Sequence, residues 1–211
     1  IRRPPRSTQS RSSAASDVYK RQVLTWPDGE SYVGEFKDDL AHGNGIWTFS
    51  NGEKYTGEFQ EAMFHGKGDI TYLDGGNYSG DFLKDMLHGT GVMTSPDGTN
   101  YKGEFQEDMF HGSGVMTYPD GSEFSGTFVD NRMHGNGVYT YPDGQNYNGE
   151  FQEDMFHGKG VMTFPDGSQF SGTFVDDLEN GKGIFTDSDQ NVFKEFWVIG
   201  KKISSEKVSG N

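Results

Sequence analysis

Residues 147–169 read YNGEFQEDMFHGKGVMTFPDGSQ, and this stretch decides the fold because it recurs along the chain. Each copy begins with an aromatic residue, followed by Gly two positions later and Phe two positions after that. The first residues of the copies follow one another at intervals of 23 without insertion: Tyr32, Tyr55, Tyr78, Tyr101, Phe124, Tyr147 and Phe170. Self-similarity at a fixed period is the signature of a repeat architecture.

Other columns of the repeat are equally regular. The glycines are Gly34, Gly57, Gly80, Gly103, Gly126, Gly149 and Gly172, and the phenylalanines are Phe36, Phe59, Phe82, Phe105, Phe128, Phe151 and Phe174. Each unit then carries a His-Gly-x-Gly element, as at His42, Gly43 and Gly45. All six histidines of the chain occupy this one position: His42, His65, His88, His111, His134 and His157.

The unit predicts two strands and two bends. Tyr-x-Gly-Glu-Phe alternates with period 2, which is typical of a strand with one buried face. Gly-Val-Met-Thr-Tyr alternates in the same way. Pro-Asp-Gly is a turn signal, since Pro presets φ and Gly supplies positive φ. We expect His-Gly-x-Gly to form the other bend. The fold class predicted is all-β: an elongated single-layer antiparallel β-meander of stacked 23-residue hairpins.

The domain boundaries follow from the repeat. Residues 23–29 match residues 115–121, so we expect an array of one half repeat and seven full repeats over 23–192. Residues 193–211 depart from the pattern and are predicted to be a degenerate cap and tail, with Lys201 and Lys202 as a charged edge that discourages further pairing. Residues 1–22, rich in Arg and Ser, are interpreted as non-native or disordered, because they resemble translated sequencing-adapter text. The alternative is a mitochondrial transit peptide.

The unit Tyr-x-Gly-Glu-Phe…His-Gly-x-Gly-Val-Met-Thr-Tyr-Pro-Asp-Gly resembles the MORN repeat (membrane occupation and recognition nexus), and the resemblance covers residues 23 to about 200. Proteins made wholly of such repeats are components of ciliary radial spoke heads, adaptors for myosin tails and cytoskeletal organisers. The resemblance implies a partner segment along an aromatic, concave face.

The chemistry-bearing columns argue against metal, cofactor and catalysis. Two strands per unit advance a sheet by roughly 10 Å, so successive histidines are too far apart to share an ion that binds His at about 2 Å. His-Gly-x-Gly also mimics an oxyanion loop, but no Gly-x-Ser-x-Gly elbow accompanies it. With no Cys in the chain, thiolate sites are excluded. We expect no enzyme, no metal and no cofactor.

The charge argues against nucleic acid and anionic lipid as partners. Residues 23–211 carry 12 basic and 31 acidic side chains, a net charge of −19. Such a surface repels polyanions. We interpret the acid column of Glu35, Glu58, Asp81, Glu104 and Glu150 as a solvated face; the alternative is a surface that steers a basic partner.

Two side-chain rows are candidates for partner binding. The first consists of Trp47, Ile70, Met93, Met116, Tyr139 and Met162, which share a face with the aromatic column. The second is a Met/Phe seam before the histidines: Leu40-Ala41, Met63-Phe64, Met86-Leu87, Met109-Phe110, Met133, Met155-Phe156 and Leu178. Met-rich strips suit adaptable binding, but each pair of the seam could equally tuck over its neighbouring loop.

The sequence therefore predicts a non-catalytic scaffold in the cytoplasm, the cytoskeleton or a cilium, with protein partners. Two alternatives stay open. One is a peripheral membrane module that binds phosphoinositides, although the net charge disfavours it. The other is a regulatory fragment of a larger enzyme.

Overall fold

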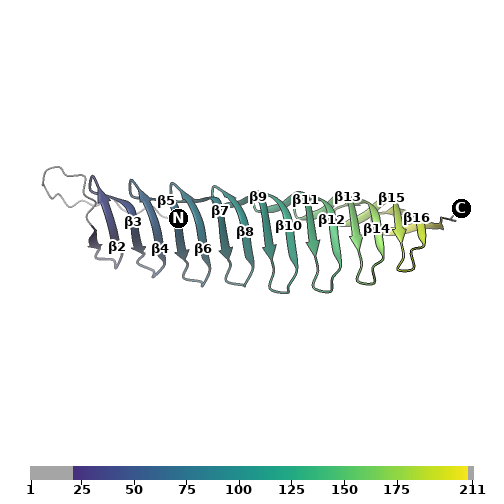
Figure 1. Ribbon diagram of the computed structural model, residues 1–211, viewed down its shortest axis with the longest axis horizontal. Helices are drawn as coiled ribbons and strands as arrows, with labels where there is room; N and C mark the ends of the chain where they lie inside the picture. The colour runs from purple at the N-terminus through teal and green to yellow at the C-terminus, as the bar shows by residue number, and fades with distance from the viewer. Residues whose placement is uncertain (1–20, 209–211) are drawn as a thin grey trace. The chain divides into compact units, whose positions relative to one another are not determined.

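The computed structural model describes residues 21–208, and all of its regular elements are strands. The chain divides into two compact units at Met109 and Phe110. Each unit is a single antiparallel sheet in which successive strands are neighbours (Figure 1). The predicted fold class, a β-meander of 23-residue hairpins, is confirmed within each unit. The predicted leader lies outside the described residues as far as residue 20, and Gln22 already belongs to the first strand.

The first unit contains β1 (Gln22–Thr25), β2 (Ser31–Lys37), β3 (Leu40–Thr48), β4 (Lys54–Gln60), β5 (Met63–Thr71), β6 (Asn77–Leu83), β7 (Met86–Thr94) and β8 (Asn100–Gln106). From Phe110 onward the second unit contains most of β9 (Met109–Thr117), then β10 (Glu123–Val129), β11 (Arg132–Thr140), β12 (Asn146–Gln152), β13 (Met155–Thr163), β14 (Gln169–Val175), β15 (Leu178–Thr186), β16 (Val192–Val198) and β17 (Lys201–Lys207). Seven-residue and nine-residue strands therefore alternate along most of each unit.

The tight bend of each hairpin is a two-residue turn that the sequence did not reveal. Asp38 and Asp39 join β2 to β3 with φ of 50° and 59°. Positive φ at both central residues defines a type I′ turn, whose twist matches that of the strands it joins. The equivalent turns have the same backbone: Glu61–Ala62, Lys84–Asp85, Glu107–Asp108, Asp130–Asn131, Glu153–Asp154 and Asp176–Asp177.

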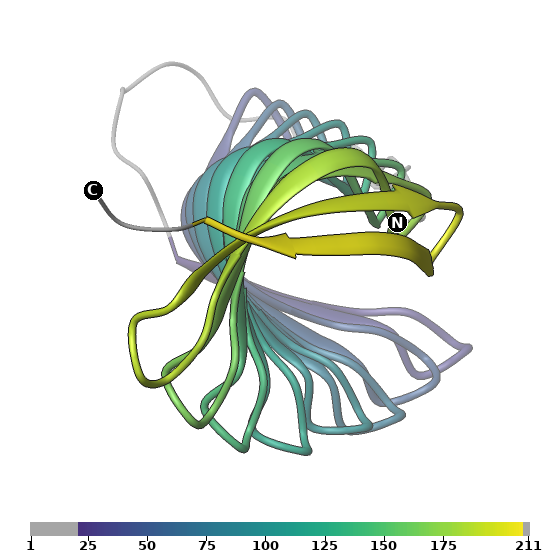
Figure 2. The same ribbon diagram turned by 90° about the vertical axis from the view of Figure 1, so that its right-hand side faces the viewer.

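The prediction that His-Gly-x-Gly forms this bend is wrong. The element lies inside the nine-residue strand, where it makes a β-bulge: Gly45 pairs with Gly34, but His42 pairs with Glu35, so two residues are skipped. Gly43 has a φ of 61°, which explains why Gly is required there. A bulge bends its strand and increases the local twist, and the strands are visibly curved in Figure 2.

The wide turn follows the predicted Pro-Asp-Gly chemistry. Gly29 has a φ of 92°, and its amide donates to the carbonyl of Trp26 at 3.1 Å. The Asp28 carboxylate accepts the amide of Glu30 at 3.1 Å. This local bond is the reason that Asp and Asn favour such positions.

One face of each sheet, here called the inner face, holds the aromatic core. Tyr55 is 0% exposed, and its ring lies over the facing glycines Gly57 and Gly68. A Cβ on Gly68 would stand 2.5 Å from the Tyr55 ring. Without that atom the ring reaches across the bulge to stack on Phe64, with centroids 3.8 Å apart. A one-layer sheet thus obtains a core by folding rings onto its own backbone. The opposite side is called the outer face.

Candidate interaction surfaces

The predicted structural columns come together as rows on the inner face. Tyr147 packs against Phe151, against Phe156 and against Phe174 of the next repeat, with centroids 5.2, 4.0 and 4.9 Å apart. Offset and edge-to-face ring pairs each stabilise by about 0.5–1.5 kcal/mol beyond their buried area. The same contacts recur in other repeats, so equivalent residues form continuous aromatic rows within each unit.

The tyrosine hydroxyls at the head of the repeat serve the backbone. Tyr147 donates to the carbonyl of Glu150 at 3.0 Å and lies 3.1 Å from the carbonyl of His157. Burial raises the pKa of Tyr147 to about 12, and the negative charge of Glu150 adds to the rise. These hydroxyls are therefore protonated donors that hold the bulge, and none is positioned as a reactive base.

The row predicted to bind a partner is only partly accessible. Trp47 and Ile70 are 2% exposed, and Met116 and Met162 are 9% and 8% exposed. Met93 and Tyr139 are half-buried. The covering rings include aromatic side chains two positions later, since Phe49 lies 6.3 Å from Trp47 and Tyr141 lies 4.9 Å from Tyr139. Most of the predicted row is therefore buried beneath other side chains of the inner face.

The accessible part of the inner face in each unit is a row of aromatic side chains at the start of the wide turns. Its members are half-buried, occur in most repeats and were not singled out from the sequence: Phe49, Tyr72, Tyr118, Tyr141 and Phe164. Burial raises the pKa of Tyr72 to about 12, and the nearby charge of Asp108 contributes. The row could have been found from the Thr-aromatic-Pro-Asp-Gly pattern, but that pattern was interpreted only as a turn.

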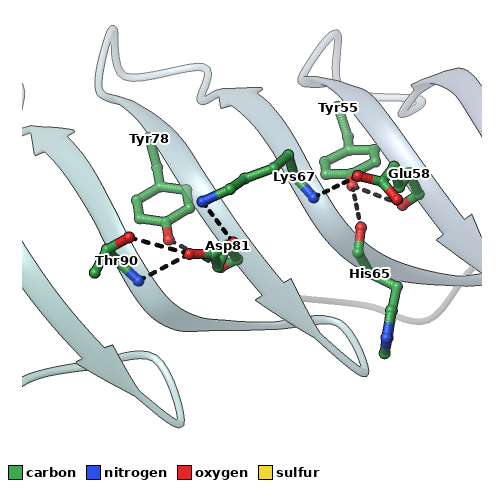
Figure 3. A network of polar contacts seen from close by, with 7 residues as sticks. All are labelled: Tyr55, Glu58, His65, Lys67, Tyr78, Asp81 and Thr90. Atoms are coloured by element: carbon green, nitrogen blue, oxygen red, sulfur yellow. Dashed lines mark hydrogen bonds and ion pairs between the residues drawn. The ribbon is translucent and has the colours of Figure 1, made fainter.

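The acid column holds the bulges (Figure 3). The Glu58 carboxylate accepts the backbone amide of Lys67 at 3.0 Å, and Asp81 accepts that of Thr90 at 3.0 Å. Lys67 Nζ also reaches Asp81 of the next strand at 2.7 Å. Although burial opposes it, hydrogen bonds from Lys67 and Thr90 lower the pKa of Asp81. The column is therefore more than the solvated face we expected, because it satisfies amides that the bulge removes from the ladder.

The second residue of most tight turns forms a link between repeats, here called the turn latch. Asp154 donates its amide to the carbonyl of Met133 at 3.1 Å and accepts the amide of Met133 on its carboxylate at 2.8 Å. The same side-chain bond joins Asp85 to Phe64, Asp108 to Leu87, Asn131 to Phe110 and Asp177 to Phe156. Ala62 makes only the backbone bond, to Ala41 at 2.9 Å.

The Met/Phe seam is divided between two faces. Phe64, Leu87 and Phe156 point inward and are 0%, 3% and 8% exposed. Met63 and Met155, one residue earlier, are half-buried, since neighbouring residues of a strand point to opposite faces. The structure therefore buries the second residue of these pairs and leaves the first partly accessible, and partner binding by the seam stays a prediction.

Two of the histidines lie near an acidic residue of a tight turn. His111 Nδ1 lies 3.8 Å from Asp130, and His157 Nδ1 lies 3.7 Å from Asp176. Among residues 21–208, no group of three or more His, Asp or Glu side chains is arranged to hold a metal ion.

Over residues 21–208, no helix is long and apolar enough to cross a membrane.

The last strands close the inner face differently. Glu195 stands where other repeats have the column glycine, and its side chain is 1% exposed. It accepts hydrogen bonds from Trp197 Nε1 at 3.0 Å, Lys202 Nζ at 2.9 Å and Ser205 Oγ at 3.2 Å. Lys202 also lies 5.4 Å from the Trp197 ring centre. Of the expected charged edge, Lys202 is bound by the buried Glu195, here called the polar plug, and both Lys201 and Lys202 remain exposed.

These features define a tandem β-hairpin repeat protein. The family model of the MORN repeat matches seven consecutive segments, residues 32–54, 55–77, 78–100, 101–123, 124–146, 147–169 and 170–192. The matched segments make up most of the sequence, and the chain belongs to the MORN repeat family.

Comparison with solved structures gives weaker likenesses. The TCP domain of Drosophila melanogaster SAS-4 (dCPAP), in complex with a proline-rich motif of Ana2 (dSTIL), is 12% identical, with 81% of this chain and 100% of that chain covered and a TM-score of 0.44. The TCP10c domain of Drosophila melanogaster Sas-4 is 10% identical over 83% and 98%, with a TM-score of 0.43. A mutant TCP10 domain of Danio rerio CPAP is 17% identical over 89% and 99%, with a TM-score of 0.29. Likenesses at these scores carry no inference about function. No curated protein is similar enough to count as a match.

Proposed function

We propose that this chain is a non-catalytic protein-interaction scaffold of the cytoskeleton or cilium, which binds an extended or helical partner segment along its inner face. The observation that carries the proposal is the accessible aromatic row of each unit, which repeats with the hairpins: Phe49 and Tyr72 in the first unit, and Tyr118, Tyr141 and Phe164 in the second. Tandem repeats create extended binding surfaces in this way. Met93 and Tyr139, the accessible residues of the row predicted from the sequence, would extend this binding surface.

The chemistry of the row suits a protein partner. Aromatic rings supply large contact areas at a low cost in conformational entropy. Tyr118 and Tyr141 have raised pKa values, mainly because of burial, so their hydroxyls are neutral donors at physiological pH. A partner segment could therefore bury apolar side chains between rings and accept hydrogen bonds from the hydroxyls.

The test compares captures by the full chain and by a double variant, Tyr118→Ser with Tyr141→Ser, from a ciliated tissue extract. Serine is a matched replacement, because Ser95 occupies the same repeat position in the first unit. We expect axonemal or cytoskeletal proteins to be captured by the wild-type chain and lost from the variant, which should keep its β-sheet circular dichroism. Equal capture by both chains would contradict the proposal.

A second measurement addresses phosphoinositide binding. The chain from residue 21 onward, which contains the whole described structure, is sedimented with vesicles that contain phosphatidylinositol phosphates. We expect no pelleting, because residues 23–211 carry a net charge of −19 and anionic headgroups require basic patches. Salt-sensitive pelleting would instead favour the membrane-associated alternative.

A further inference from the structure

Exposed apolar side chains gather at the C-terminal end of the second unit. Seven large apolar residues between positions 175 and 203 are 38% to 71% exposed: Val175, Leu178, Ile184, Phe196, Val198, Ile199 and Ile203. Single exposed apolar residues are ordinary, but two of these seven, Ile184 and Phe196, line one hollow, and apolar residues that gather in this way indicate an interaction site.

Phe196 is the most informative member of this cluster. It occupies the repeat position at which earlier units place the bulge-holding acid, as in Glu150, or a threonine, as in Thr173. Phe196 is 40% exposed and pairs with Lys182 on one side and Ser204 on the other. Because its neighbour Glu195 is buried on the inner face, Phe196 points to the outer face.

A shallow hollow of about 650 Å³ surrounds this ring. Phe196 and Ile184, both 40% exposed, supply its apolar lining. Lys182, Lys194 and Glu206 are exposed charged residues that also line it. The hollow and the aromatic row of the proposed function lie on opposite faces of the sheet.

The local charge differs from that of the rest of the array. Residues 182–208 contain five lysines and four acids. One of those acids, Glu195, forms an ion pair with Lys202. Residues 23–181 contain seven basic and 27 acidic side chains. An acidic segment is therefore repelled along most of the array but not at this end.

We propose that the hollow binds an acidic peptide segment of a partner protein that carries one large apolar side chain. The apolar side chain packs against Phe196 and Ile184, while flanking carboxylates pair with Lys182 and Lys194. Buried apolar anchors supply most of the affinity in such contacts, and rim charges set specificity and association rate. This site adds a second partner, of defined chemistry, to the partner of the inner face.

The test begins with peptide display, using the full chain and the Phe196→Glu variant as parallel baits. We expect peptides selective for the wild-type chain to share an aromatic or long aliphatic residue flanked by Asp or Glu. Enriched peptides without acidic residues, or peptides that bind both baits equally, would overturn the proposal. Because Phe196 is already partly exposed, the variant should retain the wild-type melting temperature.

Fluorescence titration of the best enriched peptide then assigns the contacts. We expect affinity to fall at least tenfold with Phe196→Glu, and severalfold with Lys194→Glu, with a loss at high salt. The inner-face variant Tyr118→Ser with Tyr141→Ser should bind the peptide as the wild type does, and a loss there would contradict a separate site. Self-association of the wild-type chain that Phe196→Glu abolishes, measured by sedimentation equilibrium, would assign the hollow to a second copy and overturn the proposal.

Discussion

An interior repeat and the last strands fill the same position in opposite ways. At Gly149 the ring of Tyr147 bends back over the backbone, and a Cβ there would lie 2.6 Å from the Cα of Gly160. At the equivalent position Glu195 takes that space, and Phe193 instead packs at 6.2 Å from Phe185. The ring belongs to a sheet that continues on both sides. The Glu195 carboxylate, which is paired with Lys202, suits the end of the array, because the strand that follows β16 does not carry the repeat pattern.

The largest effect should come from adding a side chain under an interior ring. Gly149→Ala places a Cβ against backbone and against the Tyr147 hydroxyl, and neither can move away without opening the hairpin. We expect a loss of about 3 kcal/mol in the free energy of unfolding, the upper range for overpacking. Urea unfolding monitored by tryptophan fluorescence measures it. Gly121→Asn is the comparison variant, since Gly121 has open space around it, and it should lose only about 1 kcal/mol through backbone strain at its φ of 89°.

The polar plug should be the next most sensitive position. Glu195→Ala removes the acceptor for Trp197, Lys202 and Ser205, for an expected loss of about 2 kcal/mol; Lys202 is 47% exposed and can regain water. Hydrogen exchange should rise in β16 and β17 while β12 and β13 stay protected. Uniform exchange across the second unit would show that the plug is not a local device.

The turn latch predicts changes of opposite sign. Asp154→Ala removes a side-chain bond to the Met133 amide and should cost about 1 kcal/mol. Ala62→Asp adds the missing acceptor at a φ of 62°, which Asp tolerates better than Ala, and should stabilise by a similar amount. Thermal unfolding of both variants checks the pair. A destabilised Ala62→Asp chain would refute the latch as a general contact.

The effect that is smallest at neutral pH is a dependence of stability on alkaline pH. Burial, with the charge of a neighbouring glutamate, raises the pKa of Tyr101 and Tyr147 from the ordinary tyrosine value to about 12. A raised folded-state pKa gives stability that is present below pH about 10 and is lost as pH rises towards about 12. We expect delayed tyrosinate absorbance in the folded chain, and a smaller alkaline loss of stability in Tyr147→Phe, which imitates the natural Phe124 and Phe170. An unchanged alkaline profile would argue against buried hydroxyls.

The sequence was sufficient for the fold because the repeat period and the strand alternation are both local signals. It was insufficient for the tight turns, because Glu61 and Ala62 carry no Gly or Asn to mark a type I′ turn. His-Gly-x-Gly was mistaken for that turn because its glycines signal positive φ, which bulges need as well. The burial of the predicted binding row also could not be predicted. Trp47 is covered because it pairs with Tyr32 on the neighbouring strand and packs against Phe49, and the alternation of residues along one strand does not specify either contact.

The account depends on hairpins repeated in register within each unit. Spin labels at Ser125→Cys and Ser171→Cys test this directly, because the chain has no other Cys and both sites lie on the outer face two repeats apart. Four strand spacings separate them, so dipolar spectroscopy should give a narrow distance distribution near about 20 Å. A broad distribution, or a distance that matches a closed globule, would contradict the register on which the rows and both proposed surfaces depend.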